Sequence, residues 1–144
     1  MAEAPPLDQK YTITHGWYKH LTDGYEIIKK HEPAKKLVFE PKSKRLIVEI
    51  GMYEGASTVW WIDNFLTHEN SRLIGIDPFT GSKENIENPE AHPTLDKIEK
   101  ITKKNVSLSQ HPEKVDIYKG CSWDLYSKLQ PEFEEGIDLS LIHI

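Results

Sequence analysis

The chain has 144 residues, a formal net charge of −5 and one cysteine, Cys121. This length fits a single domain, and the acidic balance argues against nucleic-acid binding, which needs a basic face. A lone cysteine excludes an intramolecular disulfide and a zinc site built from several cysteines. The first residues lack the basic start and apolar core of a signal peptide, and no apolar run has the length of a membrane span, so we expect a cytoplasmic protein with no membrane partner.

The first third of the chain has two predicted sections within this one domain. Residues 1–9 resemble a flexible, proline-containing tail. Apolar residues then recur at helical spacing, at Trp17, Leu21, Tyr25 and Ile28. Pro33 ends this pattern. We therefore expect residues 10–44 to form an N-terminal helical cap and residues 45–144 to form the core.

Strands and helices alternate in the predicted core. Four apolar, β-rich runs predict strands at residues 46–50, 73–76, 115–118 and 137–144. Helical patterns lie between them, at residues 57–66, from Pro93 onward, and at 124–129. The stretch from Phe79 to His92 has little periodicity and predicts a long loop. The alternation predicts an α/β fold with a Rossmann-like, doubly wound, mostly parallel sheet.

The most informative segment joins the first predicted strand to the helix that follows. Glu49, Gly51 and Gly55 form an acid-x-Gly-x-x-x-Gly pattern, and Ser57 opens the helix. A glycine directly after a strand permits a sharp turn and leaves room for a ligand. The free N–H groups of the helix start can bind a polar or anionic group. The alternative is a turn whose glycines serve packing alone.

Two further strand ends complete the candidate site. Asp77 ends the second strand, where a carboxylate can accept hydrogen bonds from both ribose hydroxyls, or can instead stabilise the turn before Pro78. Cys121, Ser122 and Trp123 follow the third strand. Backbone amides and Ser122 can bind an adenine edge, and Trp123 can cover a flat ring unless it belongs to the core.

The seven histidines have no metal-ligand spacing. His15 and His20 could lie near a ligand, although solvent-exposed histidines are the commoner case. His92 and His111 fall in predicted loops and carry no signal.

Together, the three strand ends resemble those of class I S-adenosylmethionine-dependent methyltransferases, particularly the small-molecule O-methyltransferases. The segment from Glu49 to Gly55 is similar to the first motif of this family, which lies under the methionine and ribose parts of the cofactor. A nicotinamide-binding domain would show Gly-x-Gly-x-x-Gly instead. The resemblance implies S-adenosylmethionine as cofactor, contacted by Glu49, Gly51, Tyr53, Gly55, Ser57, Asp77, Cys121, Ser122 and Trp123.

The resemblance also bears on the end of the chain. Members of this family complete a seven-stranded sheet, whose later part supplies the general base or metal ligands. We expect this chain to hold strands 3-2-1-4, the cofactor-binding half of a truncated enzyme that is inactive by itself. No catalytic residue or metal ligand is assigned, and a divalent metal would belong to the full-length parent.

The function implied by the resemblance is methyl transfer to a small-molecule acceptor. The alternative is a non-catalytic Rossmann-like binding or interaction module that has lost its substrate half. In either case the strand at residues 137–144 would be a sheet edge, and exposed edges recruit other strands. Self-association through this edge is therefore expected.

Overall fold

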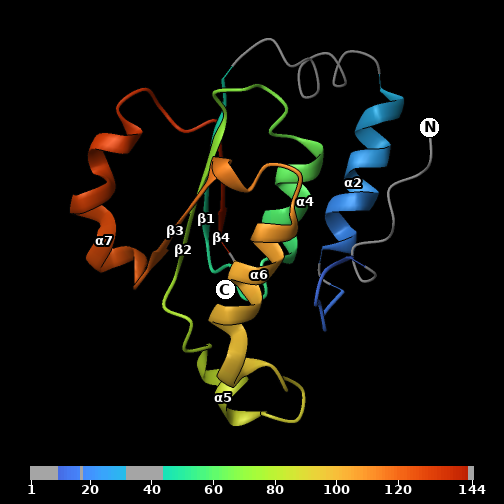
Figure 1. Cartoon of the computed structure of the whole chain (residues 1–144), viewed down its shortest axis with the longest axis vertical. Coiled ribbons are helices and arrows are strands. Elements are labelled where there is room, and N and C mark those ends of the chain that lie inside the picture. The colour runs from blue at the N-terminus through green and yellow to red at the C-terminus, as the bar shows by residue number, and fades with distance from the viewer. Residues whose placement is uncertain (1–9, 17, 32–43, 143–144) are drawn as a thin grey trace.

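A computed structural model of the protein describes residues 10–16, 18–31 and 44–142. Its centre is a parallel sheet with strand order β3-β2-β1-β4 (Figure 1). The strands are β1 (Leu46–Ile50), β2 (Arg72–Asp77), β3 (Val115–Lys119) and β4 (Leu139–Ile142). The predicted fold class and the strand order 3-2-1-4 are confirmed. Residues 143 and 144 of the last predicted strand lie outside the described residues.

Helices cover both faces of the sheet, with α7 on one side and α4, α6 and α2 on the other (Figure 1). Their bounds are α2 (Lys19–Lys30), α4 (Ala56–Asn64), α5 (Lys83–Glu87), α6 (Ile98–Leu108) and α7 (Ser122–Leu129). Strands covered on both faces read as nearly continuous apolar runs, which explains the sequences of β1 and β2. None of the helices described is long and apolar enough to cross a membrane.

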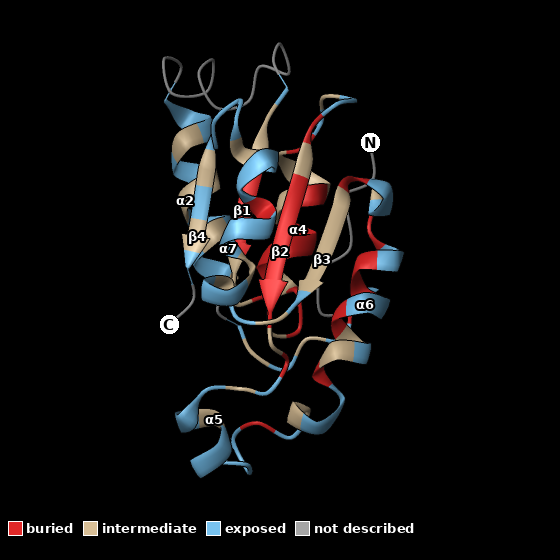
Figure 2. Cartoon of the chain, turned by 90° about the vertical axis from the view of Figure 1, so that its left-hand side faces the viewer, coloured by how far each residue is buried: buried red, intermediate tan, exposed pale blue. Residues whose placement is uncertain are grey.

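The core has one apolar layer on each face of the sheet and a third buried cluster formed by Met52, Phe79 and Ile98. Ile47, Ile62, Leu66 and Leu73 form the layer beneath α4, and Val48, Ile74, Ile76 and Leu129 form the layer beneath α7. Neighbouring strand residues enter opposite layers because successive side chains point to opposite faces. Each buried side chain of this size contributes about 1.5–3 kcal/mol. β2 is the most deeply buried strand (Figure 2).

The connection from β2 to α6 differs from the loop predicted for residues 79–92. It contains α5, a five-residue helix that begins with a capping box. The hydroxyl of Ser82 accepts a hydrogen bond from the Asn85 amide, and the Asn85 side chain accepts one from the Ser82 amide. A helix this short has no periodic apolar face, so periodicity could not reveal it. α5 lies beyond the carboxyl ends of the strands (Figure 2).

Gly75, in the middle of β2, leaves space for a side chain of the turn after β1. A Cβ atom on Gly75 would lie 2.3 Å from the Sδ atom of the buried Met52. We expect Gly75→Ala to lower the free energy of unfolding by about 1–3 kcal/mol, the usual effect of overpacking. Urea-induced unfolding measures this change.

Gly24→Ala is the matched control, because a Cβ atom there meets nothing within 4 Å. Alanine favours the helix, so this variant should unfold at the same or a higher urea concentration than the original protein. Equal stability of the Gly75→Ala variant and the original protein would contradict the packing argument.

Candidate functional site

The turn between β1 and α4 is built on left-handed backbone conformations. Gly51 has a φ of 84°, Tyr53 of 50° and Gly55 of 75°. Glycine adopts such angles readily, whereas a tyrosine there is strained. The strain at Tyr53 is held from both sides, because its N–H donates to Asp77 and its carbonyl accepts from the Thr102 hydroxyl. Strained residues fixed by their surroundings are common at ligand-binding sites.

Glu49 lies buried behind this turn and lines neither of the two cavities described below. Its carboxylate accepts hydrogen bonds from the hydroxyls of Ser57 and Thr58 in the first turn of α4. A buried carboxylate is tolerated when it is hydrogen-bonded in this way. Glu49 therefore holds the start of α4 against β1. Direct contact of Glu49 with a cofactor stays a prediction.

Asp77 organises the turn through its carboxylate. One oxygen accepts from the amides of Met52, at 2.7 Å, and Tyr53, at 2.9 Å. The other accepts from the amide of Phe79, at 2.6 Å. Asp77 thus joins the turn after β1 to the turn after β2, which is the structural role considered for it from the sequence. It also borders a cavity, so its ribose contact stays a prediction.

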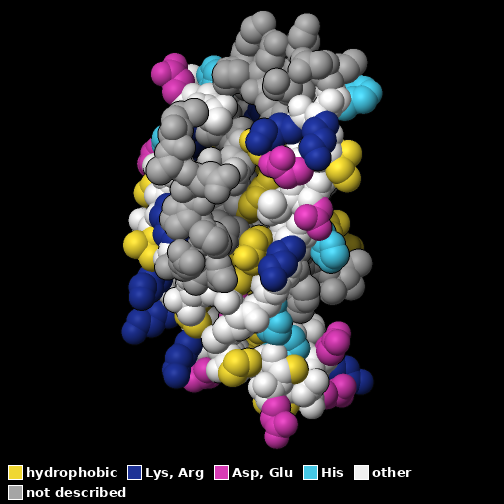
Figure 3. All heavy atoms as spheres, turned by 90° about the vertical axis from the view of Figure 1, so that its right-hand side faces the viewer, with side chains coloured by type: hydrophobic (Ala, Val, Ile, Leu, Met, Phe, Trp, Pro, Cys, Tyr) yellow, Lys and Arg dark blue, Asp and Glu magenta, His cyan; other side chains and the backbone are white. Residues whose placement is uncertain are grey.

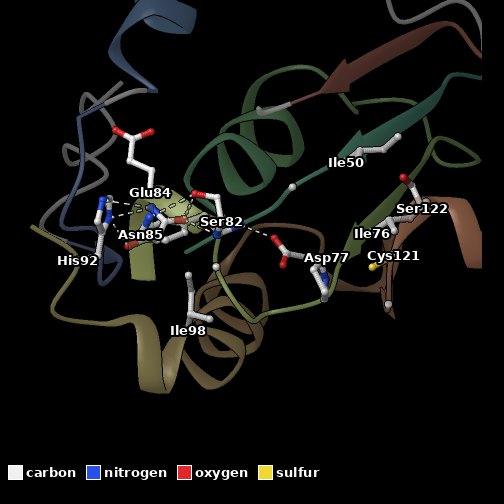
Figure 4. A pocket seen from close by; sticks show the side chains of 15 residues that line it. Ile50, Ile76, Asp77, Ser82, Glu84, Asn85, His92, Ile98, Cys121 and Ser122 are labelled. Atoms are coloured by element: carbon white, nitrogen blue, oxygen red, sulfur yellow. Dashed lines mark hydrogen bonds between the residues drawn. The ribbon is translucent and has the colours of Figure 1, made fainter. Parts of the chain in front are cut away.

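A cavity of about 380 Å³, here called the strand-end cavity, lies at the carboxyl ends of β1, β2 and β3. Its lining contains Gly51, Tyr53, Asp77, Cys121 and Ser122, which are five of the predicted site residues. Figure 4 shows Asp77 in the middle, with Cys121 and Ser122 on one side and the residues of α5 and His92 on the other. The structure therefore brings together residues from three strand ends.

Trp123 does not line this cavity. Its side chain is 89% exposed in the first turn of α7, which begins at Ser122 rather than at the predicted Asp124. The exposure rules out the alternative that Trp123 belongs to the core. Its predicted contact with a flat ring is untested by this geometry.

A second cavity, of about 370 Å³, lies at the start of α4 and is here called the helix-start cavity. Its lining includes Gly51, Tyr53, Ala56 and Ser57 from the turn and helix. Its other wall consists of His15, Tyr18, His20 and Leu21. The two cavities share Gly51 and Tyr53, so they meet at the glycine turn.

Residues 11–15, here called the N-terminal strap, are held against the core by side-chain hydrogen bonds. The Tyr11 hydroxyl donates to Asp63 at 2.5 Å, and burial with the negative charge of Asp63 raises the pKa of Tyr11. The backbone of Thr12 both donates to and accepts from the side chain of Asn105. Thr14 donates twice to Glu54, from its amide and its hydroxyl, each at 2.7 Å.

The strap places a histidine beside the glycine turn. The Tyr53 hydroxyl lies 3.0 Å from Nδ1 of His92 and 3.5 Å from Nε2 of His15. The two imidazole rings have centroids 5.0 Å apart. Burial, with the negative charge of Glu54, raises the pKa of Tyr53, so its phenol stays protonated near neutral pH. Sequence reasoning missed this cluster, because its members come from three segments with no common spacing.

No group of three or more histidine, cysteine, aspartate or glutamate side chains in the described part of the chain is arranged to hold a metal ion.

Comparison with known proteins agrees with the fold. The profile of a family described as a methyltransferase domain matches residues 48–144. No curated protein matches the chain. A putative O-methyltransferase from Klebsiella pneumoniae has a TM-score of 0.54 and 14% identity, over 90% of this chain and 49% of its own.

A second solved structure is the O-methyltransferase TomG from Streptomyces achromogenes, in complex with S-adenosylmethionine. Its TM-score is 0.55 and its identity 15%, over 99% of this chain and 55% of its own. At such identities the likeness shows the fold, and the present chain spans about half the length of both structures. Because the family profile covers more than half of the chain, the protein belongs to the methyltransferase-domain family.

Proposed function

We propose that the chain binds S-adenosylmethionine across its two cavities, as part of an enzyme that methylates a small-molecule acceptor. The observation that carries this proposal is that the strand-end and helix-start cavities meet at Gly51 and Tyr53. A ligand with a nucleoside at one end and an amino acid at the other matches two compartments joined at a turn. Membership of the methyltransferase-domain family supports the choice of ligand.

The nucleoside belongs in the strand-end cavity under this proposal. A carboxylate offers about four lone-pair positions, and the backbone uses three of those on Asp77. Asp77 keeps acceptor capacity for a ribose hydroxyl on the side that borders the cavity. Cys121 and Ser122 would lie at the adenine edge, with Trp123 at the rim.

The amino-acid end belongs in the helix-start cavity. α4 begins after Gly55, and its first turn contains no acidic residue. The buried carboxylate of Glu49 lies against the hydroxyls of Ser57 and Thr58 in that turn. The first N–H groups of the helix would be the donors for the ligand's carboxylate. Gly51, Tyr53 and Ser57 would form the floor, and Glu49 would support it from behind. Gly55 lines neither cavity and lies against Thr102, so its contact with a cofactor stays a prediction.

The alternative function, a non-catalytic binding module, would use the same two cavities. It would differ from the proposed enzyme only in that no methyl group is transferred. The acceptor, a divalent metal and the general base are predictions for a longer parent chain. Self-association through β4, an edge of the described sheet, is likewise a prediction.

Calorimetric titration tests the cofactor assignment. We expect S-adenosylmethionine and S-adenosylhomocysteine to bind, and NAD not to bind. Ser122→Val should weaken binding about threefold to tenfold through loss of one hydrogen bond. Ser127→Val, on the exposed side of the same helix, is the matched control and should bind as the original protein does. Binding of NAD in place of both S-adenosyl ligands would contradict the proposal.

A further inference from the structure

Two imidazoles and a phenol meet where the two cavities join. His92 borders the strand-end cavity, His15 borders the helix-start cavity, and Tyr53 borders both. The Tyr53 hydroxyl contacts a ring nitrogen of each histidine. The side-chain nitrogen Nδ2 of Asn85 also lies within hydrogen-bond distance of His92, 3.2 Å from Nδ1 and 3.1 Å from Nε2. Figure 3 shows histidine side chains at several separate places on this face of the molecule, some of them toward the α5 end.

A single buried carboxylate sets the geometry of this cluster. Glu54 is 1% exposed and accepts hydrogen bonds from the Thr14 amide, the Thr14 hydroxyl and the Thr94 hydroxyl, the last at 2.6 Å. Thr14 directly precedes His15, Thr94 closely follows His92, and Glu54 directly follows Tyr53. Glu54 therefore ties together the three segments that carry the cluster, and it is a positioning residue.

We propose that His15 and His92 face the sulfur atom of the bound cofactor and take up the proton that methyl transfer releases, in place of a base from the later strands of a longer parent chain. This inference rests on the proposed function. In S-adenosylmethionine the sulfur lies between the nucleoside and the amino acid. If these ends occupy the two cavities, the sulfur lies at their junction, beside Tyr53 and the imidazole pair.

The charges balance in such a step. The acceptor oxygen forms a bond to the methyl carbon, and the carbon–sulfur bond breaks with its electron pair left on sulfur. The sulfonium becomes a neutral thioether, and the O–H proton passes to a neutral imidazole. One positive charge disappears at sulfur and one appears on the imidazole. The positive charge of the sulfonium therefore disfavours protonation of the imidazoles. The neutral thioether of the product does not.

Other titratable groups also face the junction. Asp77 and Glu84 border the strand-end cavity, and Glu54 and His20 border the helix-start cavity. The experiment must separate the imidazole pair from these groups and from the ligand's own amino group. Comparison of two ligands that differ by one methyl group and one charge removes every titration that does not respond to the charge on sulfur. The histidine variants then separate the imidazole pair from the groups that do respond.

The test is calorimetry of the 144-residue chain with S-adenosylmethionine and with S-adenosylhomocysteine, at pH 7.5 and pH 5.5. These two pH values lie on either side of the ordinary pKa of an imidazole. A positive charge about 5 Å from the sulfonium disfavours it by about fourfold or more, fourfold being the effect with the screening of bulk water. We expect the change from pH 7.5 to pH 5.5 to lower the affinity for S-adenosylmethionine by this factor relative to the affinity for S-adenosylhomocysteine.

Variants test whether the pH dependence of the affinity ratio arises from His15 and His92. The double variant His15→Gln with His92→Asn should abolish the pH dependence of the affinity ratio. His111→Gln, which lines neither cavity, should leave it unchanged. A ratio independent of pH in the original protein, with both ligands bound, overturns the inference and leaves the proposed function standing. Failure of both ligands to bind overturns both. A pH-independent affinity ratio in the original protein contradicts the inference even if a variant does not fold.

Discussion

Replacing Gly51 with valine is expected to abolish binding of S-adenosylhomocysteine. Gly51 borders both cavities, so a branched side chain there would enter the space where the ligand crosses the turn. Its φ of 84° also places valine in a strained conformation. Steric exclusion and strain together predict an affinity loss of about a hundredfold or more. Calorimetric titration of the variant measures this loss.

Gly136→Val is the matched control for backbone strain. Gly136 has a φ of 91°, and a Cβ atom there meets nothing within 4 Å. It lines neither cavity, so this variant should lose stability and keep its affinity for the ligand. An equal loss of affinity in both variants would mean that strain, rather than filled space, explains the effect at Gly51.

Asp77→Ala is expected to lower both the free energy of unfolding and the affinity for S-adenosylhomocysteine. The substitution removes the acceptor for the amides of Met52, Tyr53 and Phe79. Hydrogen bonds to a charged group contribute about 1.5–3 kcal/mol each, so we expect a loss of about 3 kcal/mol or more after partial rescue by water. Chemical denaturation and calorimetry measure the two losses.

Asp77→Asn separates the two roles of this residue. Its remaining carbonyl oxygen can still accept from Met52 and Tyr53, whereas its NH₂ group would face the amide of Phe79. Stability should fall less than in Asp77→Ala. Asp96→Ala, at an exposed position in the short 3-10 helix Leu95–Lys97, should change stability by no more than about 0.5 kcal/mol. An Asp77→Ala variant as stable as Asp96→Ala would contradict the role of Asp77 in holding the turn.

The order of the sheet could be predicted because its strands are covered on both faces and because helices alternate with them. The runs that become β1 and β2 are apolar throughout, and βα crossovers of one hand leave few arrangements. The capping box at the start of α5 was not predicted. Ser82 and Asn85 create α5 by pairing with each other, and such a pair resembles any polar loop in sequence.

The candidate site was predictable where a residue's role follows from its place after a strand. Gly51, Asp77, Cys121 and Ser122 do border one cavity, as their positions at three strand ends suggested. The directions in which individual side chains point were not predictable. The carboxylate of Glu49 is directed toward α4 rather than toward the cavity, and the Trp123 side chain lies in solvent. These outcomes depend on packing in three dimensions.

The N-terminal strap, which places His15 at the site, was the least predictable part. Tyr11, Thr12 and Thr14 bind partners that have no sequence relation to them, namely Asp63, Asn105 and Glu54. Polar contacts of this kind leave no periodic pattern. They become visible only when the fold has placed the partners.

The N-terminal strap also makes the helix-start cavity depend on contacts between distant parts of the chain. Its hydrogen bonds join residues 40, 52 and 93 positions apart. Such contacts require the closure of long loops, which is entropically unfavourable. The wall that contains His15 is therefore complete only when Asp63, Asn105 and Glu54 all stand in their places in the folded core.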